Sequence, residues 1–183
     1  MKSTEFLTEL MDQPVSYNIS QSYGDYQANF SVGESEIEMS LITSDLVYGS
    51  QLDEHVPVVQ IEFDDDNSPN ASYKLSNRGN SIAIFSTIIR ILKQFHKKKR
   101  PTFYVYEADK GSDKARLYQK LADKFFGGLG IVKIDAKRFD RLMYKSTGGE
   151  LAYNADHVAI FTTPDRYHKN QERWRLPNLE DVI

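Results

Sequence analysis

The stretch NRGNSIAIFSTIIRILKQF, residues 77–95, decides the fold of this chain. After Gly79, apolar residues recur at the three- and four-residue spacing of an amphipathic helix. The positions that follow this spacing are Ile82, Phe85, Ile88, Ile89, Leu92 and Phe95. Ile84 and Ile91 widen the apolar stripe, which predicts a helix buried on more than one side. Cations at residues 96–100 suit the negative end of the helix dipole, and Pro101 then ends the helix.

The sequence before this helix alternates with a period of two. Two apolar series, Ala28, Phe30, Val32 and Ile37, Met39, Leu41, are separated by a turn at Gly33. A third series follows at Val59, Ile61 and Phe63, and a short strand is expected at residues 72–75. Alternation of this kind predicts strands with one buried and one solvated face. We therefore expect an antiparallel meander.

The sequence after the helix begins with TFYVYEA, residues 102–108, which is almost continuously apolar and predicts a central strand covered on both faces. A second helix is expected to begin at Ser112 or Asp113 and to end near Gly127. Its apolar stripe is Leu117, Tyr118, Leu121, Ala122 and Phe125. Further strands are expected at residues 131–134, 141–144 and 158–162. The order of elements predicts an α+β fold with a mixed, mostly antiparallel sheet flanked by helices.

Length and composition limit the classes of protein to consider. A chain of 183 residues is most simply one domain, with an N-terminal helix within residues 1–14 and a polar C-terminal tail at residues 165–183. The chain has no cysteine, which excludes disulfides, thiolate metal sites and a cysteine nucleophile. No apolar run is long enough to cross a membrane, and a cytoplasmic location is expected. The aspartates at 64–66 lack the mid-loop glycine of a calcium site, so no metal is expected.

The junction at residues 77–83 has two interpretations. In the first, the unpaired N–H groups and the positive end of the helix dipole hold a phosphate group. Gly79 would let the phosphate approach the backbone closely, and Asn80 tolerates left-handed geometry. In the second, Asn77 or Asn80 caps a core helix and Gly79 only makes the turn. The junction alone does not choose between them.

The junction resembles the cofactor loop of the GNAT superfamily of N-acetyltransferases. That loop usually reads Arg/Gln-x-x-Gly-x-Gly/Ala and lies between a strand and the following helix. The aligned residues here are Arg78, Gly79, Asn80, Ser81, Ile82 and Ala83. The first and last positions agree with the family pattern, whereas Ser81 replaces the central glycine. The resemblance covers residues 58–130 and implies that this loop binds the pyrophosphate of acetyl-CoA.

The same resemblance implies a general acid and a general base. Family members often carry a tyrosine near the start of the second helix, where it protonates the leaving thiolate of coenzyme A, and Tyr118 matches that position. A phenol is protonated at neutral pH, although a tyrosine on an apolar stripe is also an ordinary core residue. Glu62 and Glu107 are the nearest candidates for the base, and the sequence does not choose between them. The substrate implied is an amine.

The chain also resembles small proteins of tailed bacteriophages, which share the order of an Arg-Gly turn, a helix, a strand and a helix with Leu-Tyr. This second resemblance implies a non-catalytic interaction protein that binds a protein partner of the host or of the virion. The basic residues at 96–100 lack interleaved aromatic side chains, and the chain carries a net charge of -3. These two observations argue against nucleic acid as the partner. The oligomeric state is not predicted.

Overall fold

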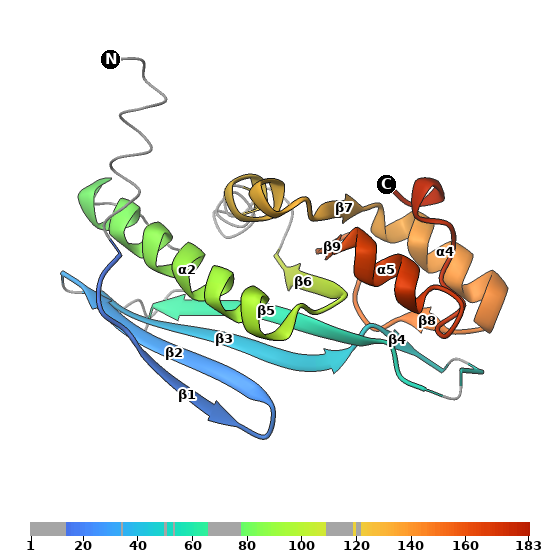
Figure 1. The fold of residues 1–183 in the computed structure, drawn as a ribbon, viewed down its shortest axis with the longest axis horizontal. Coiled ribbons are helices and arrows are strands. Elements are labelled where there is room, and N and C mark those ends of the chain that lie inside the picture. The colour runs from blue at the N-terminus through green and yellow to red at the C-terminus, as the bar shows by residue number, and fades with distance from the viewer. Residues whose placement is uncertain are drawn as a thin grey trace, which may run out of the picture.

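The computed structural model describes residues 14–33, 35–49, 51–52, 54–65, 78–108, 119 and 122–183. These residues form an α+β fold in which helices flank a mostly antiparallel, seven-stranded sheet (Figure 1). The strand order is β1 (Asn18–Ser22), β2 (Asp25–Val32), β3 (Ser35–Asp45), β5 (Pro57–Asp65), β6 (Phe103–Glu107), β9 (Val158–Thr162) and β7 (Val132–Ile134). Of these neighbours only β5 and β6 are parallel. A second, two-stranded sheet pairs β4 (Val47–Tyr48) with β8 (Glu150–Leu151).

The predicted meander is confirmed for its described strands. The apolar positions of β2 and β3 are buried, namely Tyr26, Ala28, Phe30, Val32, Ile37, Met39 and Leu41. The hairpin turns between Val32 and Ser35, which face each other in the register, and Gly33 has the positive φ of 64° that glycine adopts readily. The strand predicted at residues 72–75 lies outside the described residues, as does the predicted N-terminal helix.

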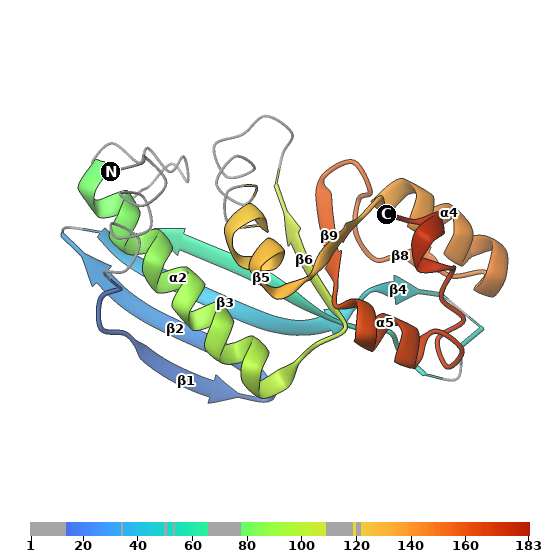
Figure 2. The ribbon, with the colours of Figure 1, turned by 45° about the horizontal axis from the view of Figure 1, so that its top comes forward.

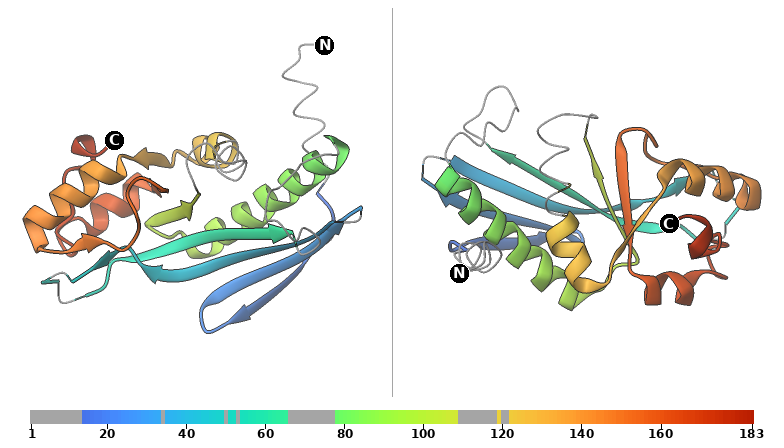
Figure 3. Two further views of the ribbon diagram at one scale, coloured as in Figure 1. Left: turned by 180° about the vertical axis from the view of Figure 1, so that it is seen from behind. Right: turned by 90° about the horizontal axis from the view of Figure 1, so that it is seen from above.

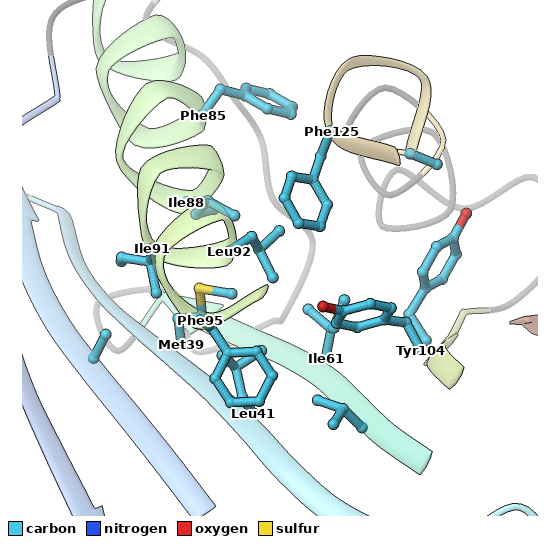
Figure 4. Packing of buried hydrophobic residues seen from close by; sticks show 14 of the residues in the cluster. Met39, Leu41, Ile61, Phe85, Ile88, Ile91, Leu92, Phe95, Tyr104 and Phe125 are labelled. Carbon is cyan, nitrogen blue, oxygen red and sulfur yellow. The ribbon is translucent and has the colours of Figure 1, made fainter. Parts of the chain in front are cut away.

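The long apolar helix is α2 (Arg78–Lys99). It covers one face of the sheet, and its stripe of Phe85, Ile88, Leu92 and Phe95 is buried as predicted (Figure 4). We call the cluster between α2 and the sheet the α2 core; its members include Met39, Ile61, Ile88, Leu92, Tyr104 and Phe125. The helix ends where Arg100 takes a positive φ of 45° and donates its backbone N–H to the carbonyl of His96. Pro101 follows, as expected.

Strand β6 is buried on both faces, as the apolar run predicted. Tyr104 and Tyr106 belong to the α2 core, together with residues of the short helix η1 (Ala122–Phe126). Phe103 and Val105 face the other way, into a second cluster under α4 (Ala136–Thr147) and α5 (Pro164–Asn170). We call this cluster the α4 core; its members include Phe103, Val105, Phe139, Ile160, Tyr167 and Trp174. Figure 3 shows α2 and the α4–α5 pair over different parts of the sheet.

The strand predicted at residues 141–144 is wrong, because these residues lie inside α4. The helix begins at Asp135, whose side chain accepts a hydrogen bond from the backbone N–H of Arg138. Its buried positions are Ala136, Phe139, Met143 and Thr147, which follow helical and not strand spacing. The short apolar run at Leu142 and Met143 resembles a strand only when it is read without the preceding Phe139.

The segment at residues 165–183, expected as a polar tail, carries structure that closes the α4 core. It holds most of α5 and the short helix η3 (Leu179–Asp181). The short helix η2 (Gly127–Leu129) lies earlier in the chain, directly after η1, and has no buried residue. Five side chains of the segment at residues 165–183 are buried, namely Tyr167, Trp174, Leu176, Leu179 and Val182. The phenol of Tyr167 donates to the carbonyl of Pro177 at 2.9 Å. This segment is polar on average, but its widely spaced apolar side chains are buried and fix it to the α4 core.

Candidate functional site

Strands β5 and β6 separate from each other after a short contact. Their parallel register contains two pairs, Val59 with Tyr104 and Gln60 with Val105. Beyond these pairs β5 continues to Asp65 and β6 to Glu107, and Figure 2 shows the two strands running in different directions. The carboxyl ends of parallel neighbours are a common place for ligand sites in open sheets. The point of separation is therefore the part of the sheet to search for functional groups.

Alternation along the two strands places polar residues on the sheet face opposite α2. Val59 and Ile61 belong to the α2 core, so the intervening Gln60 and the next residue, Glu62, point to the opposite face. Along β6 the same argument places Glu107 on the face of Phe103 and Val105. Gln60 and Glu62 are half-buried, and Glu107 is exposed. Two carboxylates therefore flank the point where the strands separate.

A hydrogen-bonded network connects this face to the segment after β8. The phenol of Tyr153 donates to Oε1 of Gln60 at 3.3 Å, and Nε2 of Gln60 donates to Oε1 of Glu62 at 2.7 Å. We call these three residues the Gln60 network. The amide of Gln60 thus receives from a phenol and donates to a carboxylate, which fixes its orientation. The network therefore holds the carboxylate of Glu62 through its Oε1 atom.

The electrostatic surroundings keep Tyr153 protonated. Burial of the ring raises the pKa of Tyr153, and the negative charges of Glu107 and Glu62 raise it further, while a hydrogen bond with Ser44 opposes them. At neutral pH the side chain is therefore a phenol that donates a proton. A carboxylate that accepts a proton and a phenol that donates one lie in the same network, which is the minimum equipment for general acid–base chemistry.

The residues predicted for the cofactor loop form the beginning of α2. The helix starts at Arg78 and includes Gly79, Asn80, Ser81 and Ile82, so Asn80 is not its N-cap. Their side chains and Asn77 lie outside the described part. Ala83 is partly buried against the α2 core, and its carbonyl accepts the hydroxyl of Thr87 at 2.7 Å. The first N–H groups of a helix have no helical acceptor, and the first turn of α2 contains no acidic residue. This helix end is thus suited to an anion.

The start of α2 and the Gln60 network lie on opposite faces of β5. The helix covers the face that carries Val59 and Ile61, whereas Gln60 and Glu62 point away from it. Figures 2 and 3 show the first turns of α2 beside the carboxyl end of β5. A ligand that contacts both regions must therefore pass between β5 and β6, where the strands diverge.

Aromatic side chains fill the α2 side of β6. Tyr104 is fully buried, with ring centroids 6.3 Å from Phe125 and 5.3 Å from Phe126. Its hydroxyl is 2.7 Å from Nδ1 of His96 at the far end of α2, and burial raises the pKa of Tyr104. Phe85 is buried as well and extends from α2 toward the segment that carries Phe125 (Figure 4). The space on this side of β6 is packed close to the strand.

The outcome for the predicted acid and base residues is mixed. Tyr118 lies outside the described residues. Glu62 and Glu107, the two candidate bases, lie on the same sheet face, and the negative charge of each raises the pKa of Tyr153. Tyr153 was missed, because it meets Gln60 across 93 positions of sequence and nothing in its neighbourhood, LAYNAD, marks it. Its place could be found only after β8 and β9 were located.

In the part of the chain that the structure describes, no group of three or more His, Cys, Asp or Glu side chains is arranged to hold a metal ion. No described helix combines the length and the apolar character needed to span a bilayer.

Comparison of the chain with protein-family models, with curated proteins and with solved structures returned no match.

Proposed function

We propose that this protein is a GNAT-like N-acyltransferase that uses an acyl-CoA, with acetyl-CoA as the first candidate. The observation that carries the proposal is the divergence of β5 and β6 with the Gln60 network at the point of separation. The pattern at residues 78–83 and its position at the start of α2 support it. An N-acyltransferase of this kind works in the cytoplasm, where acyl-CoA is available, and its substrate is an amine.

The chain's own residues divide the work between the two faces of β5. The N–H groups at the start of α2 would hold the pyrophosphate, because the positive end of the helix dipole faces it. Bound acyl-CoA would supply an activated thioester carbonyl. Glu62 accepts the proton that the attacking amine must lose, and Gln60 holds the carboxylate in place for that transfer. Orientation of the amine beside Glu62 contributes to the rate as well.

The proton that the leaving thiolate requires has two candidate donors. The resemblance implies Tyr118. The structure adds Tyr153, whose phenol stays protonated beside two carboxylates. Two separate variants, Tyr118→Phe and Tyr153→Phe, distinguish these donors. Loss of the true donor should lower the rate at saturating substrate by a factor of roughly 10² or more, as is typical of general acid catalysis. Loss of the other tyrosine should not.

The first experiment is calorimetric titration with acetyl-CoA. Micromolar binding that Ser81→Trp abolishes supports a cofactor site at the start of α2. Lys93→Trp is the matched control, because Lys93 is exposed on the same helix far from its N-terminus. The control must bind like the wild type. Absence of binding at millimolar acetyl-CoA would refute the proposal.

A second candidate function is that of a non-catalytic interaction protein, such as a phage protein that binds a host or virion component. The aromatic packing of Phe85, Tyr104 and Phe125 beside β6 favours it, because those rings occupy the side from which a cofactor would enter. This function predicts no binding of acetyl-CoA. It also predicts a purified complex with one defined protein that survives gel filtration and is unaffected by Glu62→Gln.

A further inference from the structure

A cavity of about 200 Å³ lies between the C-terminal half of α2 and the first three strands. Its floor consists of Ile19, Tyr26, Ala28, Met39 and Leu41, and its roof of Ile91, Gln94, Phe95 and Lys98. The register places Ile19, Ala28 and Met39 in one row across β1, β2 and β3. Tyr26 and Leu41 stand in the next row. The cavity is on the α2 side of the sheet, away from the Gln60 network.

The cavity exists because a small residue lies under the helix. Ala28 contributes only a methyl group to the floor, whereas its neighbours along β2 on the same face are Tyr26 and Phe30. The ring of Tyr26 meets the ring of Phe95 edge to face, with centroids 5.1 Å apart, and closes one end. Ile19 is 46% exposed on the edge strand β1, so the cavity opens beside that strand.

The closed end of the cavity carries an unsatisfied polar group. The hydroxyl of Tyr26 is buried and forms no hydrogen bond of ordinary geometry among the described residues, although the ammonium groups of Lys98 and Lys99 act on it. Buried hydroxyls in folded proteins almost always have a partner, so an exception indicates a water or a ligand. The ammonium groups of Lys98 and Lys99 lie 5.5 Å and 5.3 Å from the centre of the same ring. The hydroxyl of Tyr26 and the ammonium groups of Lys98 and Lys99 therefore lie together at one end of the apolar cavity.

Electrostatics at this end favour a negative charge. Burial by itself raises the pKa of Tyr26, but the two ammonium groups outweigh it and the pKa is lower than its ordinary value. The pKa direction shows that the positive charges act on the hydroxyl. An anion that accepts the phenol proton in a hydrogen bond would satisfy the hydroxyl and both lysines together.

We propose that this cavity binds a small carboxylate with an apolar body, its carboxylate at Tyr26, Lys98 and Lys99 and its body between Ala28 and Ile91. An apolar cavity of roughly 150 Å³ holds benzene, so 200 Å³ suits a linear or aromatic body of about eight carbons. Longer chains would have to leave the cavity beside β1. This proposal stands independently of the acyltransferase proposal, because it rests on other residues, in β1–β3 and the C-terminal half of α2.

The test is calorimetric titration of the full chain with three probes of the same length, octanoate, octanol and octylamine. Octanoate is expected to bind. Octanol is expected to bind at least about tenfold more weakly, because it forms no ion pairs with the two lysines. Octylamine is expected not to bind, because its charge is positive. Equal binding of the three probes, or no binding of octanoate at millimolar concentration, would overturn the proposal.

Two variants locate the site. Tyr26→Phe removes only the hydroxyl, so octanoate is expected to bind about tenfold more weakly while octanol is unaffected. The free variant is expected to melt no lower than the wild type, since an unsatisfied buried group has been removed. Ala28→Leu fills the floor and is expected to abolish binding of both octanoate and octanol. Wild-type binding of octanoate by either variant would overturn the proposal, and Lys93→Gln, exposed on α2, is the control that must bind normally.

Discussion

At their amino ends β5 and β6 belong to a closely connected region, whereas at their carboxyl ends they separate. Beside the start of β6, the carbonyl of Thr102 accepts the hydroxyl of Thr162 at 2.9 Å and the N–H of Thr163 at 3.0 Å. Phe103 meets the rings of Phe139, Tyr167 and Trp174 with centroids 6.0, 5.7 and 6.4 Å away. At the other end, the side chain of Gln60 accepts one described hydrogen bond from outside β5, the 3.3 Å bond from Tyr153. The described contacts are therefore denser at the amino ends of the two strands, whereas the proposed acid–base residues lie where the strands separate.

The largest expected effect tests the connected end. Phe103→Ala removes a fully buried ring from the α4 core and leaves a cavity. We expect the free energy of unfolding to fall by about 3–5 kcal/mol, measured by urea denaturation. Glu107→Gln, at the exposed end of the same strand, is the control and should change it by less than about 0.5 kcal/mol. Similar losses in both variants would show that the two ends do not differ.

The second prediction concerns chemistry at the open end. Glu62→Gln keeps the size of the side chain but removes the proton acceptor. We expect kcat for acyl transfer to fall by about 100-fold, equivalent to about 2.7 kcal/mol, with the melting temperature unchanged. Glu107→Gln in the same assay decides between the two candidate bases. Full activity of both variants would remove these carboxylates from the mechanism.

The third prediction compares one hydrogen bond at each end. Thr162→Val removes a buried hydroxyl, but the carbonyl of Thr102 keeps its bond to the N–H of Thr163, so the expected loss is about 1 kcal/mol. Tyr153→Phe removes the longer, partly exposed bond to Gln60 and should cost less, about 0.5 kcal/mol. Urea denaturation measures both. A larger loss for Tyr153→Phe would mean that the open end also holds the strands.

The smallest effect is a pH dependence at the end of α2. Burial lowers the pKa of His96, the charge of Arg100 lowers it further, and Asp165 partly opposes them. The folded protein therefore favours neutral His96, and the unfolded chain binds the proton more readily. Stability should fall as the pH drops below about 6.5, the ordinary value, and level off below the folded pKa. In melting curves from pH 7.5 to 5, His96→Gln should flatten this slope slightly, and a slope equal to that of the wild type would contradict the prediction.

The sequence predicted best those helices and strands whose burial pattern can be read from their own residues alone. The alternation in β2 and β3 reflects burial of one strand face, and the widened apolar stripe of α2 reflects the burial of Ile84 and Ile91 beside the central stripe. Strand β6 lies between the two cores, with Phe103 and Val105 in one and Tyr104 and Tyr106 in the other, and its continuous apolar run indicated this. Helix α4 was missed because its buried residues are spaced too far apart to dominate a short window.

The candidate site could be predicted only in part for a related reason. Glu62 was identified because alternation alone places it on the polar face of β5. Tyr153 comes from the other half of the chain, and only the position of β9 beside β6 brings it to Gln60. The residue pattern around Tyr153 does not indicate its contact with Gln60. Arg78 and Ser81 remain predictions, since the structure describes their backbone as helix and not their side chains.

The distance in sequence across the β6–β9 pair has a consequence for the order of folding. The β2–β3 hairpin pairs Val32 with Ser35, three positions apart, whereas Thr102 and Thr162 are 60 positions apart and Gln60 and Tyr153 are 93 apart. Closing longer loops costs more chain entropy, so these contacts should form later. In pulsed hydrogen exchange during refolding, amides of β2 and β3 should become protected before those of β6 and β9. Simultaneous protection would contradict this order. In the predicted order, the Gln60 network is the last of these parts to assemble, so partly folded chains lack it.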